Sequence, residues 1–285
     1  MAYSDYLKVV RPQQWYKNLL VFLPLIFVGQ LLDARLFWAT ALGFVSLCLA
    51  SSFNYIINDI VDRRKDRAHP EKRNRPIASG RVDVGIAALI AVVLLVLSLR
   101  IAYVLDHTFM LAVMFLIILT QVYSFFLKNI AFADILAIGV NFVTRAVAGT
   151  FIIDVKISPW LILCTFFFAL FLSAGKRHSD VLLLGRNARY HKHALASYTP
   201  QVTNALMVIT TAMLVASYSL YSVLGEHRYL GVTIPFALYA IFRYFSHIYS
   251  GSSIARHPEK VFMDWQMLAG MTLWALAAFA ALYII

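Results

Sequence analysis

The stretch VGIAALIAVVLLVLSLRIAYV, residues 84–104, contains Arg100 as its one charged side chain. A helix of about 20 residues covers the roughly 30 Å hydrocarbon core of a bilayer. Comparable apolar runs recur along the whole chain, and lipid tolerates no unpaired backbone polar groups, so each run should be helical. The sequence therefore predicts an all-α polytopic membrane protein whose nine transmembrane helices lie at 18–32, 36–58, 84–104, 108–127, 131–153, 159–175, 202–224, 230–250 and 266–285.

The composition excludes several classes of protein. Of the 285 residues, 61% are hydrophobic and 14% are charged, and the mean hydropathy is +0.74. Soluble domains carry roughly 25% charged residues, and disordered chains carry few apolar ones. A disordered chain is thus excluded and a soluble enzyme is disfavoured. No shift in composition marks a boundary, so residues 1–285 are expected to form a single intramembrane domain.

The net charge of +11 predicts an orientation in the membrane. Most Lys and Arg residues lie before the first span or in two polar loops, 59–83 and 176–200. Cytoplasmic loops are enriched in these residues, which places the N-terminus and both loops in the cytoplasm and the C-terminus outside. Binding of nucleic acid is disfavoured because the basic residues alternate with apolar spans. The N-terminal stretch does not read as a cleaved signal peptide.

Polar residues cluster where the second predicted span ends, in the stretch NDIVDRRKD at 58–66. Asn58, Asp62 and Asp66 are spaced four apart and therefore share one helical face, which Asp59 joins. Like charges at this spacing destabilise a helix, whereas Mg²⁺ takes carboxylates, substrate phosphates and waters as ligands. The pattern favours a magnesium site over the alternative, a solvated acidic face neutralised by neighbouring basic residues.

The loop that follows is strongly basic and reads KRNRPIASGR at 72–81. Arg75 precedes Pro76, which restricts Arg75 to extended or turn backbone. Because a guanidinium group offers planar paired donors to phosphate, we expect Arg75 to bind a phosphate. Lys72 is a second candidate, although the basic bias of cytoplasmic loops explains it as well.

The fifth predicted span carries a polar stripe. Asp134, Ile138, Asn141 and Arg145 are spaced four, three and four apart, so they share one face. Polar groups inside a bilayer normally face a substrate path or a partner helix. Asp134 and Arg145 are candidates for substrate binding, and Asn141 is equally well explained by hydrogen bonding between helices.

These motifs resemble the UbiA-type intramembrane prenyltransferase superfamily, and the resemblance extends over essentially the whole chain. It implies nine helices around a central cavity that opens to the cytoplasmic side. It also implies that Asn58, Asp62 and Asp66 bind Mg²⁺ and a diphosphate, with Asp59 as a fourth catalytic residue. Two further stretches share the resemblance, namely Tyr123-Ser124-x-x-Leu127-Lys128 and Arg145-x-x-x-Gly149, and they imply that Tyr123, Lys128 and Arg145 belong to the substrate-binding set.

The loop predicted after the sixth span departs from most of the superfamily, because the second aspartate-rich motif is reduced to Asp180. Lys176 and Arg177 make this segment cationic, which suits an anionic acceptor better than a second Mg²⁺. Asp180 is retained as a substrate-binding candidate, although Lys176 and Asp180, four apart, could instead form a surface ion pair.

This departure resembles one branch of the superfamily, the decaprenyl-phosphate phosphoribosyltransferases. The stretches RPQQWYKN at 11–18, HPEKRNRPIASG at 69–80 and GKR at 175–177 carry that resemblance. It implies Mg²⁺-dependent transfer of 5-phosphoribose from 5-phosphoribosyl 1-diphosphate to a polyprenyl phosphate of the decaprenyl type. Lys17, Lys176 and Arg177 are then expected to hold the lipid phosphate, at a bacterial inner membrane.

Three other functions remain open on the sequence alone. An aromatic prenyltransferase that uses a prenyl diphosphate donor would normally carry the second acidic motif. A transporter would be favoured by charges at the bilayer midplane, for which Arg145 is weak support. A non-catalytic lipid-binding scaffold is the third, and the oligomeric state, including a homo-oligomer, is left open.

Overall fold

The computed structural model describes residues 3–68, 72–184, 197–225, 227, 229–256 and 258–284. Within these ranges the chain forms two compact units. Unit 1 takes its residues from Met1–Ile26, Gln30–Phe125 and Thr144–Ile157, and unit 2 from Phe27–Gly29, Phe126–Val143 and Ser158–Ile285. Positions 69–71 of the basic loop lie outside the described residues.

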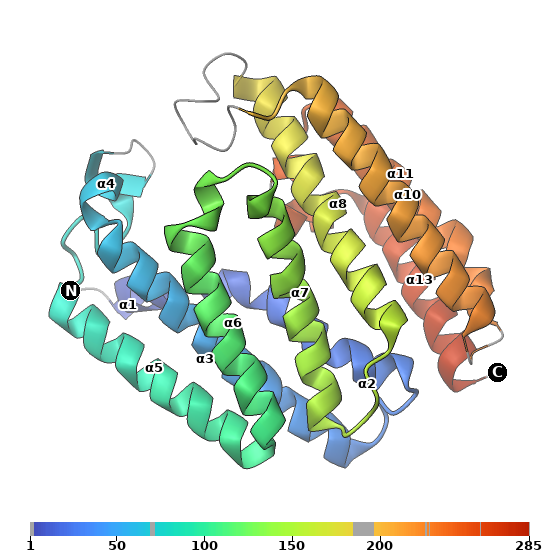
Figure 1. The fold of residues 1–285 in the computed structure, drawn as a ribbon, viewed down its shortest axis with the longest axis horizontal. Coiled ribbons are helices and arrows are strands. Elements are labelled where there is room, and N and C mark those ends of the chain that lie inside the picture. The colour runs from blue at the N-terminus through green and yellow to red at the C-terminus, as the bar shows by residue number, and fades with distance from the viewer. Residues whose placement is uncertain are drawn as a thin grey trace. The chain divides into compact units, whose positions relative to one another are not determined.

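Unit 1 is built on three long helices, of which α3 packs against both α5 and α6 (Figure 1). Leu47, Phe109 and Leu116 are fully buried between them, and together with Val21 they form an apolar core. The elements of unit 1 are α1 (Tyr3–Val10), η1 (Pro12–Phe22), most of α2 (Leu23–Phe27), α3 (Ala34–Val61), α4 (Arg63–Ala68), η2 (Lys72–Asn74), α5 (Val84–Leu105), α6 (His107–Phe125) and residues 144–152 of α7 (Ala133–Ile152).

In a second apolar cluster of unit 1, the basic loop packs against the end of α3. Ile77 and Val82 of the loop are buried against Ile56 of α3 and Val9 of α1. Burial of side chains this size stabilises the arrangement by about 1.5–3 kcal/mol each. The loop is therefore held next to the acidic end of α3 by packing as well as by charge.

In unit 2, α8 packs against α10, and α11 packs against α13 (Figure 1). Phe171, Met207 and Tyr244 are buried at the centre of its main apolar core. The elements of unit 2 are η3 (Leu127–Asn129), residues 133–143 of α7, α8 (Pro159–Leu184), α10 (Pro200–Leu224), η6 (Leu230–Thr233), α11 (Ile234–Tyr249), α12 (Ser253–Arg256), η7 (Pro258–Met263) and α13 (Trp265–Tyr283).

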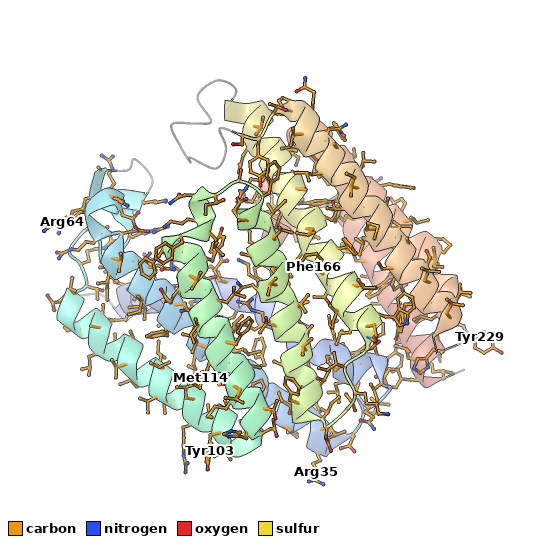
Figure 2. All side chains as sticks on the ribbon, viewed as in Figure 1. Arg35, Arg64, Tyr103, Met114, Phe166 and Tyr229 are labelled. Atoms are coloured by element: carbon orange, nitrogen blue, oxygen red, sulfur yellow. The ribbon has the colours of Figure 1, made fainter. Side chains whose placement is uncertain are left out.

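Several long helices begin at a capping side chain. Asp33 accepts hydrogen bonds from the first backbone N–H groups of α3, and Asp83 and Asp264 do the same for α5 and α13. Such caps satisfy donors that have no partner within the helix. Beyond the caps the helices are apolar, and Figure 2 shows Tyr103, which is 57% exposed, projecting from the end of α5. Exposed apolar side chains on long helices are expected where lipid replaces water.

Seven helices of the described residues are long and apolar enough to cross a membrane, which makes the chain a multi-pass membrane protein. They are α3, α5, α6, α7, α8, α10 and α13. The helical class predicted from the sequence is confirmed, and the described residues form no strand. The count of nine is not confirmed.

In each of the two remaining predicted spans a 3₁₀-helix takes the place of part of the α-helix. Where 18–32 was expected to form one helix, the chain forms the 3₁₀-helix η1 and then the five-residue α2, which contains Pro24. Where 230–250 was expected, the four-residue η6 precedes α11, whose 16 residues begin at Ile234-Pro235. A helix of that length covers about 24 Å, less than the hydrocarbon core. Prolines and 3₁₀ geometry break runs that hydropathy alone joins.

Candidate functional site

The acidic stretch lies where α3 ends and α4 begins. Asp62 caps the C-terminus of α3, and the backbone N–H of Asp66 donates to the carbonyl of Asp62 at 2.8 Å. The backbone N–H of Asp62 likewise donates to the carbonyl of Asn58 at 2.9 Å. The helical spacing predicted for the motif is therefore retained through the junction of the two helices.

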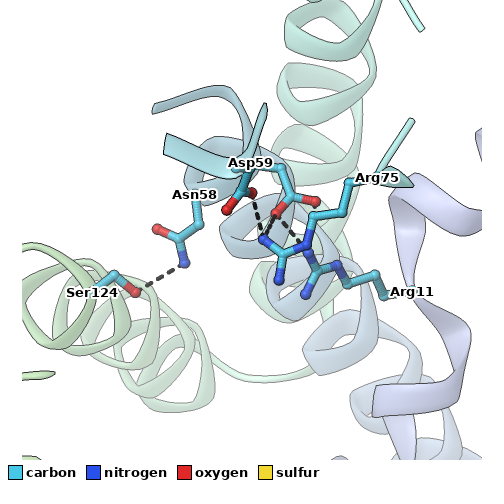
Figure 3. A network of polar contacts seen from close by, with 6 residues as sticks. Arg11, Asn58, Asp59, Arg75 and Ser124 are labelled. Carbon is cyan, nitrogen blue, oxygen red and sulfur yellow. Dashed lines mark hydrogen bonds and ion pairs between the residues drawn. The ribbon is translucent and has the colours of Figure 1, made fainter. Parts of the chain in front are cut away.

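The polar side chains of this motif nevertheless point in two directions. Asn58 donates from Nδ2 to Ser124 Oγ of α6 at 2.9 Å (Figure 3). Asp59 turns to the other side, where it meets Arg11 and Arg75 (Figure 3). Consecutive residues of a helix are about 100° apart, which explains why Asn58 and Asp59 diverge.

Arg75 links the basic loop to both ends of the acidic stretch. Its Nη1 lies 3.0 Å from Asp59 Oδ1 and 2.7 Å from Asp66 Oδ2. The turn predicted at Arg75-Pro76 is present, because the N–H of Arg75 donates to the carbonyl of Lys72 and the N–H of Ser79 to the carbonyl of Arg75. The loop thus aims Arg75 at the acidic cluster, while the side chain of Lys72 is exposed.

Arg11 is a member of the site that the sequence did not single out. Its Nη2 lies 2.6 and 2.7 Å from the two oxygens of Asp59, and its guanidinium lies 5.1 Å from the centre of the Tyr55 ring. Its backbone has φ 55°, the left-handed region that residues with a Cβ rarely adopt. Arg11 precedes Pro12, as Arg75 precedes Pro76, and that repeated Arg-Pro pair was the available signal.

The oxygen donors near the end of α3 fit a magnesium ion that shares its ligands with a substrate. Asn58 and Asp62 are half-buried, and Asp66 gives one carboxylate oxygen to Arg75. Among the described residues no three His, Cys, Asp or Glu side chains gather into a metal cluster of their own. In enzymes Mg²⁺ commonly takes one or two carboxylates and completes its shell with substrate phosphates and waters.

Arg145 is also brought to unit 1, at a buried position. Its Nε donates to Asn18 Oδ1 at 2.8 Å, and Asn18 is completely buried. Ser51 Oγ lies 3.3 Å from the same oxygen, and Asn18 Nδ2 lies 3.3 Å from Cys48 Sγ. η1 therefore supplies the amide that orients Arg145, a contact that the sequence pattern did not indicate.

Asp134 and Arg177 form a buried pair in unit 2. Arg177 Nε lies 2.9 Å from Asp134 Oδ2, and the exposed fractions of the two residues are 6% and 0%. Tyr198 Oη donates to Asp134 Oδ1 at 2.7 Å and accepts from the backbone N–H of Phe132 at 2.9 Å. Burial, followed by the hydrogen bond to Asp134, raises the pKa of Tyr198 above its ordinary value.

The structure corrects one expectation and leaves two site roles as predictions. The segment containing Lys176, Arg177 and Asp180 was predicted as loop, but α8 continues as a helix to Leu184. Arg177 was expected to hold the lipid phosphate, yet it is buried, paired with Asp134 and 3.6 Å from Asp180. Asp134, expected to bind substrate, is engaged by Arg177 and Tyr198 instead. The substrate-binding roles of Arg177 and Asp134 stay predictions.

The other predicted residues are placed as follows. Lys17 donates from Nζ to Gln14 Oε1 at 2.7 Å, and Asn141 donates from Nδ2 to the carbonyl of Ala137 at 3.2 Å. This hydrogen bond of Asn141 lies within its own helix, α7, and the interhelical hydrogen bonding considered for Asn141 stays a prediction. Tyr123 lies in α6 and Lys128 in η3, both half-buried, and Lys176 is exposed on α8.

Comparison with known proteins gives the same family as the motifs. The model of the UbiA prenyltransferase family matches residues 19–268. The decaprenyl-phosphate phosphoribosyltransferase of Mycolicibacterium smegmatis is 34% identical, over 98% of this chain and 93% of that protein. Its namesake in Corynebacterium glutamicum is 32% identical, over 98% of this chain and 86% of that protein.

A solved structure of a UbiA homologue from Archaeoglobus fulgidus, bound to GPP and Mg²⁺, has the same fold. Its TM-score is 0.75, its sequence identity is 22%, and the match covers 98% of this chain and 99% of that one. The family match, the relatives and the fold agree with the motif at the end of α3. The chain belongs to the UbiA prenyltransferase family.

Proposed function

We propose that the chain transfers 5-phosphoribose from 5-phosphoribosyl 1-diphosphate to a polyprenyl phosphate of the decaprenyl type, with Mg²⁺, and releases diphosphate. The observation that carries the proposal is the cluster in which Arg75 bridges Asp59 and Asp66 beside Asn58 and Asp62. Oxygen ligands for a hard cation and guanidinium donors for phosphate lie together there. The relatives named for this reaction, matched over nearly their whole length, support the choice of donor and acceptor.

The proposed donor site lies in unit 1. Asn58, Asp62 and Asp66 would hold the magnesium ion, which neutralises the leaving diphosphate. Arg75 and Arg145 donate charge-assisted hydrogen bonds to phosphate oxygens, and these bonds strengthen as charge develops on the leaving group. Lys128 remains a predicted donor of the same kind, and Tyr123 a predicted neighbour of the substrate.

The reaction needs no general base on the protein. The bond from the ribose anomeric carbon to diphosphate breaks, and a bond from that carbon to a lipid phosphate oxygen forms. A phosphate monoester has a second pKa of about 6, so the acceptor is already largely a dianion at pH 7. Lys17 and Lys176 remain the predicted cations for the lipid phosphate, and Asp180 remains a predicted substrate contact.

The proposal includes an orientation. η1 with α2, and η6 with α11, would complete nine crossings of a bacterial inner membrane within one transferase domain of residues 1–285. The N-terminus and the acidic cluster would face the cytoplasm, and the C-terminus would face outside, as the distribution of basic residues favours. A C-terminal reporter that is active only outside the cytoplasm should give signal, and signal from a reporter active only in the cytoplasm would contradict the orientation.

The function is tested by offering purified protein two donors. With Mg²⁺, labelled 5-phosphoribosyl 1-diphosphate and polyprenyl phosphate should place label in the lipid phase. A prenyl diphosphate with aromatic acids should give no product. Product from the second pair alone would establish the aromatic prenyltransferase in place of the proposed function.

A further inference from the structure

We propose that Asp59 is a positioning residue whose carboxylate fixes Arg11 and Arg75 for the phosphates of the donor, and that it does not bind the metal. The inference rests on the proposed function, and it divides the acidic motif between two tasks. Asn58, Asp62 and Asp66 serve the magnesium ion, whereas Asp59 serves the two arginines.

The first support is that both oxygens of Asp59 are engaged by guanidinium groups. Arg11 Nη2 contacts Oδ1 at 2.6 Å and Oδ2 at 2.7 Å, and Arg75 Nη1 contacts Oδ1 at 3.0 Å. Figure 3 shows the two guanidinium groups meeting at this one carboxylate. A metal ion bound to Asp59 would have to displace charge-assisted hydrogen bonds, which are among the strongest in proteins.

The second support is that the side chain of Asp59 is more deeply buried than those of the two arginines. The side chain of Asp59 is 5% exposed, whereas those of Arg11 and Arg75 are 19% and 30% exposed. A ligand that approaches from solvent therefore reaches the guanidinium groups before it reaches the carboxylate. The charges of Arg11 and Arg75 are balanced by those of Asp59 and Asp66, and the guanidinium groups are the more exposed members of this cluster, where a phosphate can contact them.

The third support is that Arg11 and Arg75 lie in separate segments of the chain and both contact Asp59 of α3. Arg11 lies between α1 and η1 with a left-handed backbone, and Arg75 lies in the turn after η2. A strained backbone persists only where the surroundings hold it, and here Asp59 and the ring of Tyr55 hold the side chain. Asp59 is the common point that sets the position of both guanidinium groups.

The test compares Asp59→Asn with Asp83→Asn in the full chain, reconstituted in lipid nanodiscs. Asp59→Asn preserves the shape of the side chain and removes its charge. Asp83 is an exposed cap of α5, where Asn also caps well, so the control makes the same substitution outside the site. Three quantities are measured: the KM for 5-phosphoribosyl 1-diphosphate, the Mg²⁺ concentration for half-maximal rate, and the Kd for inorganic diphosphate with Mg²⁺ by calorimetry.

We expect Asp59→Asn to raise the donor KM and the diphosphate Kd by about tenfold or more, because two cations lose their shared partner. The Mg²⁺ requirement should stay near that of wild type, whereas Asp62→Asn should raise it. Asp83→Asn should change none of the three quantities. A raised Mg²⁺ requirement in Asp59→Asn, or an unchanged KM and Kd, would overturn the inference.

Arg11→Gln tests the same link from the other side and does not alter the buried carboxylate. Alone it should raise the diphosphate Kd without changing the Mg²⁺ requirement. Combined with Asp59→Asn it should add little, because both changes break the same ion pair. Additive effects would contradict the shared role. If wild type binds diphosphate but transfers no ribose, the proposed function fails, while the dependence of diphosphate binding on Asp59 still decides this inference.

Discussion

Arg145 Nε donates a hydrogen bond of 2.8 Å to Asn18 Oδ1, although the two residues are 127 positions apart in the chain. Asn18 is fully buried in η1, and Arg145 is 8% exposed in α7. A guanidinium group at such a position is held in one orientation by its hydrogen bonds. In the proposed reaction that orientation decides whether Arg145 meets the diphosphate.

Asn18→Ala should lower kcat/KM for the donor by about 10- to 100-fold, because small displacements of a positioned group have effects of this size. The variant also removes a buried amide, so some loss of thermal stability is expected. Ser98→Ala removes a buried hydrogen bond between α3 and α5 and serves as the control for stability. If Ser98→Ala and Asn18→Ala lose equal stability and equal activity, Asn18 has no orienting role.

Asp62→Asn should raise the Mg²⁺ concentration needed for half-maximal transfer, because one charged ligand is removed while the side chain keeps its shape. Full removal of metal by a chelator should abolish transfer in wild type, and added Mg²⁺ should restore it. The measurement is a titration of initial rate with Mg²⁺ at saturating donor. An unchanged titration in Asp62→Asn would remove this residue from the metal site.

Asp134→Asn should destabilise the protein by about 3–5 kcal/mol, since it removes the charge nearest to the buried Arg177 and leaves the more distant Asp180 as its counter-ion. Asp134→Leu combined with Arg177→Met should recover much of that loss. The melting temperature in detergent measures both effects.

By contrast, Lys176→Met should leave the melting temperature unchanged and raise the KM for polyprenyl phosphate, because Lys176 is exposed on the same helix as Arg177. If Lys176→Met lowered the melting temperature and Asp134→Asn left it unchanged, Arg177 would again be the candidate for the acceptor site.

Asp264 predicts an acid limit to stability. Burial alone would raise its pKa, but hydrogen bonds from the Met267 backbone, Arg243 and His247 outweigh burial and lower the pKa from 3.8 to about 2. The folded state therefore binds this proton less readily than the unfolded state. The resulting stability is complete above the ordinary pKa of 3.8 and is lost as the pH falls toward 2.

The melting temperatures of wild type and Asp264→Asn in detergent check this pH dependence. They should differ at pH 6 and converge as the pH approaches 2. A difference that is constant over this range would contradict a contribution from the charge of Asp264.

Most of the long helices could be predicted from local runs of apolar residues. The predicted span at 84–104 corresponds to α5 at Val84–Leu105, and the one at 202–224 to α10 at Pro200–Leu224, because an unbroken apolar run has few alternatives to a membrane helix. The predictions at 18–32 and 230–250 were wrong as single helices. Hydropathy reports where apolar residues lie, but it does not distinguish the 3₁₀ geometry of η1 and η6 from an α-helix.

The site was predictable only where its contacts are local. The helical spacing of Asn58, Asp62 and Asp66 was predicted from the sequence and is retained, and the predicted turn at Arg75 brings it to Asp66, nine residues away. The contact of Arg11 with Asp59 joins residues 48 apart, and no helical period reports it. Arg177 shows the same limit: spacing suggested a local cationic face, whereas packing paired Arg177 with Asp134, 43 residues away.

The most direct measurement follows two labels in one reaction. Purified protein is incubated with Mg²⁺, polyprenyl phosphate and 5-phosphoribosyl 1-diphosphate that carries ¹⁴C in the ribose and ³²P in the β-phosphate. We predict that ¹⁴C enters the lipid phase while ³²P stays in water as diphosphate, and that Asp62→Ala abolishes the transfer. Transfer of ³²P to lipid, or no transfer of ¹⁴C by a folded sample with any polyprenyl phosphate offered, would contradict it.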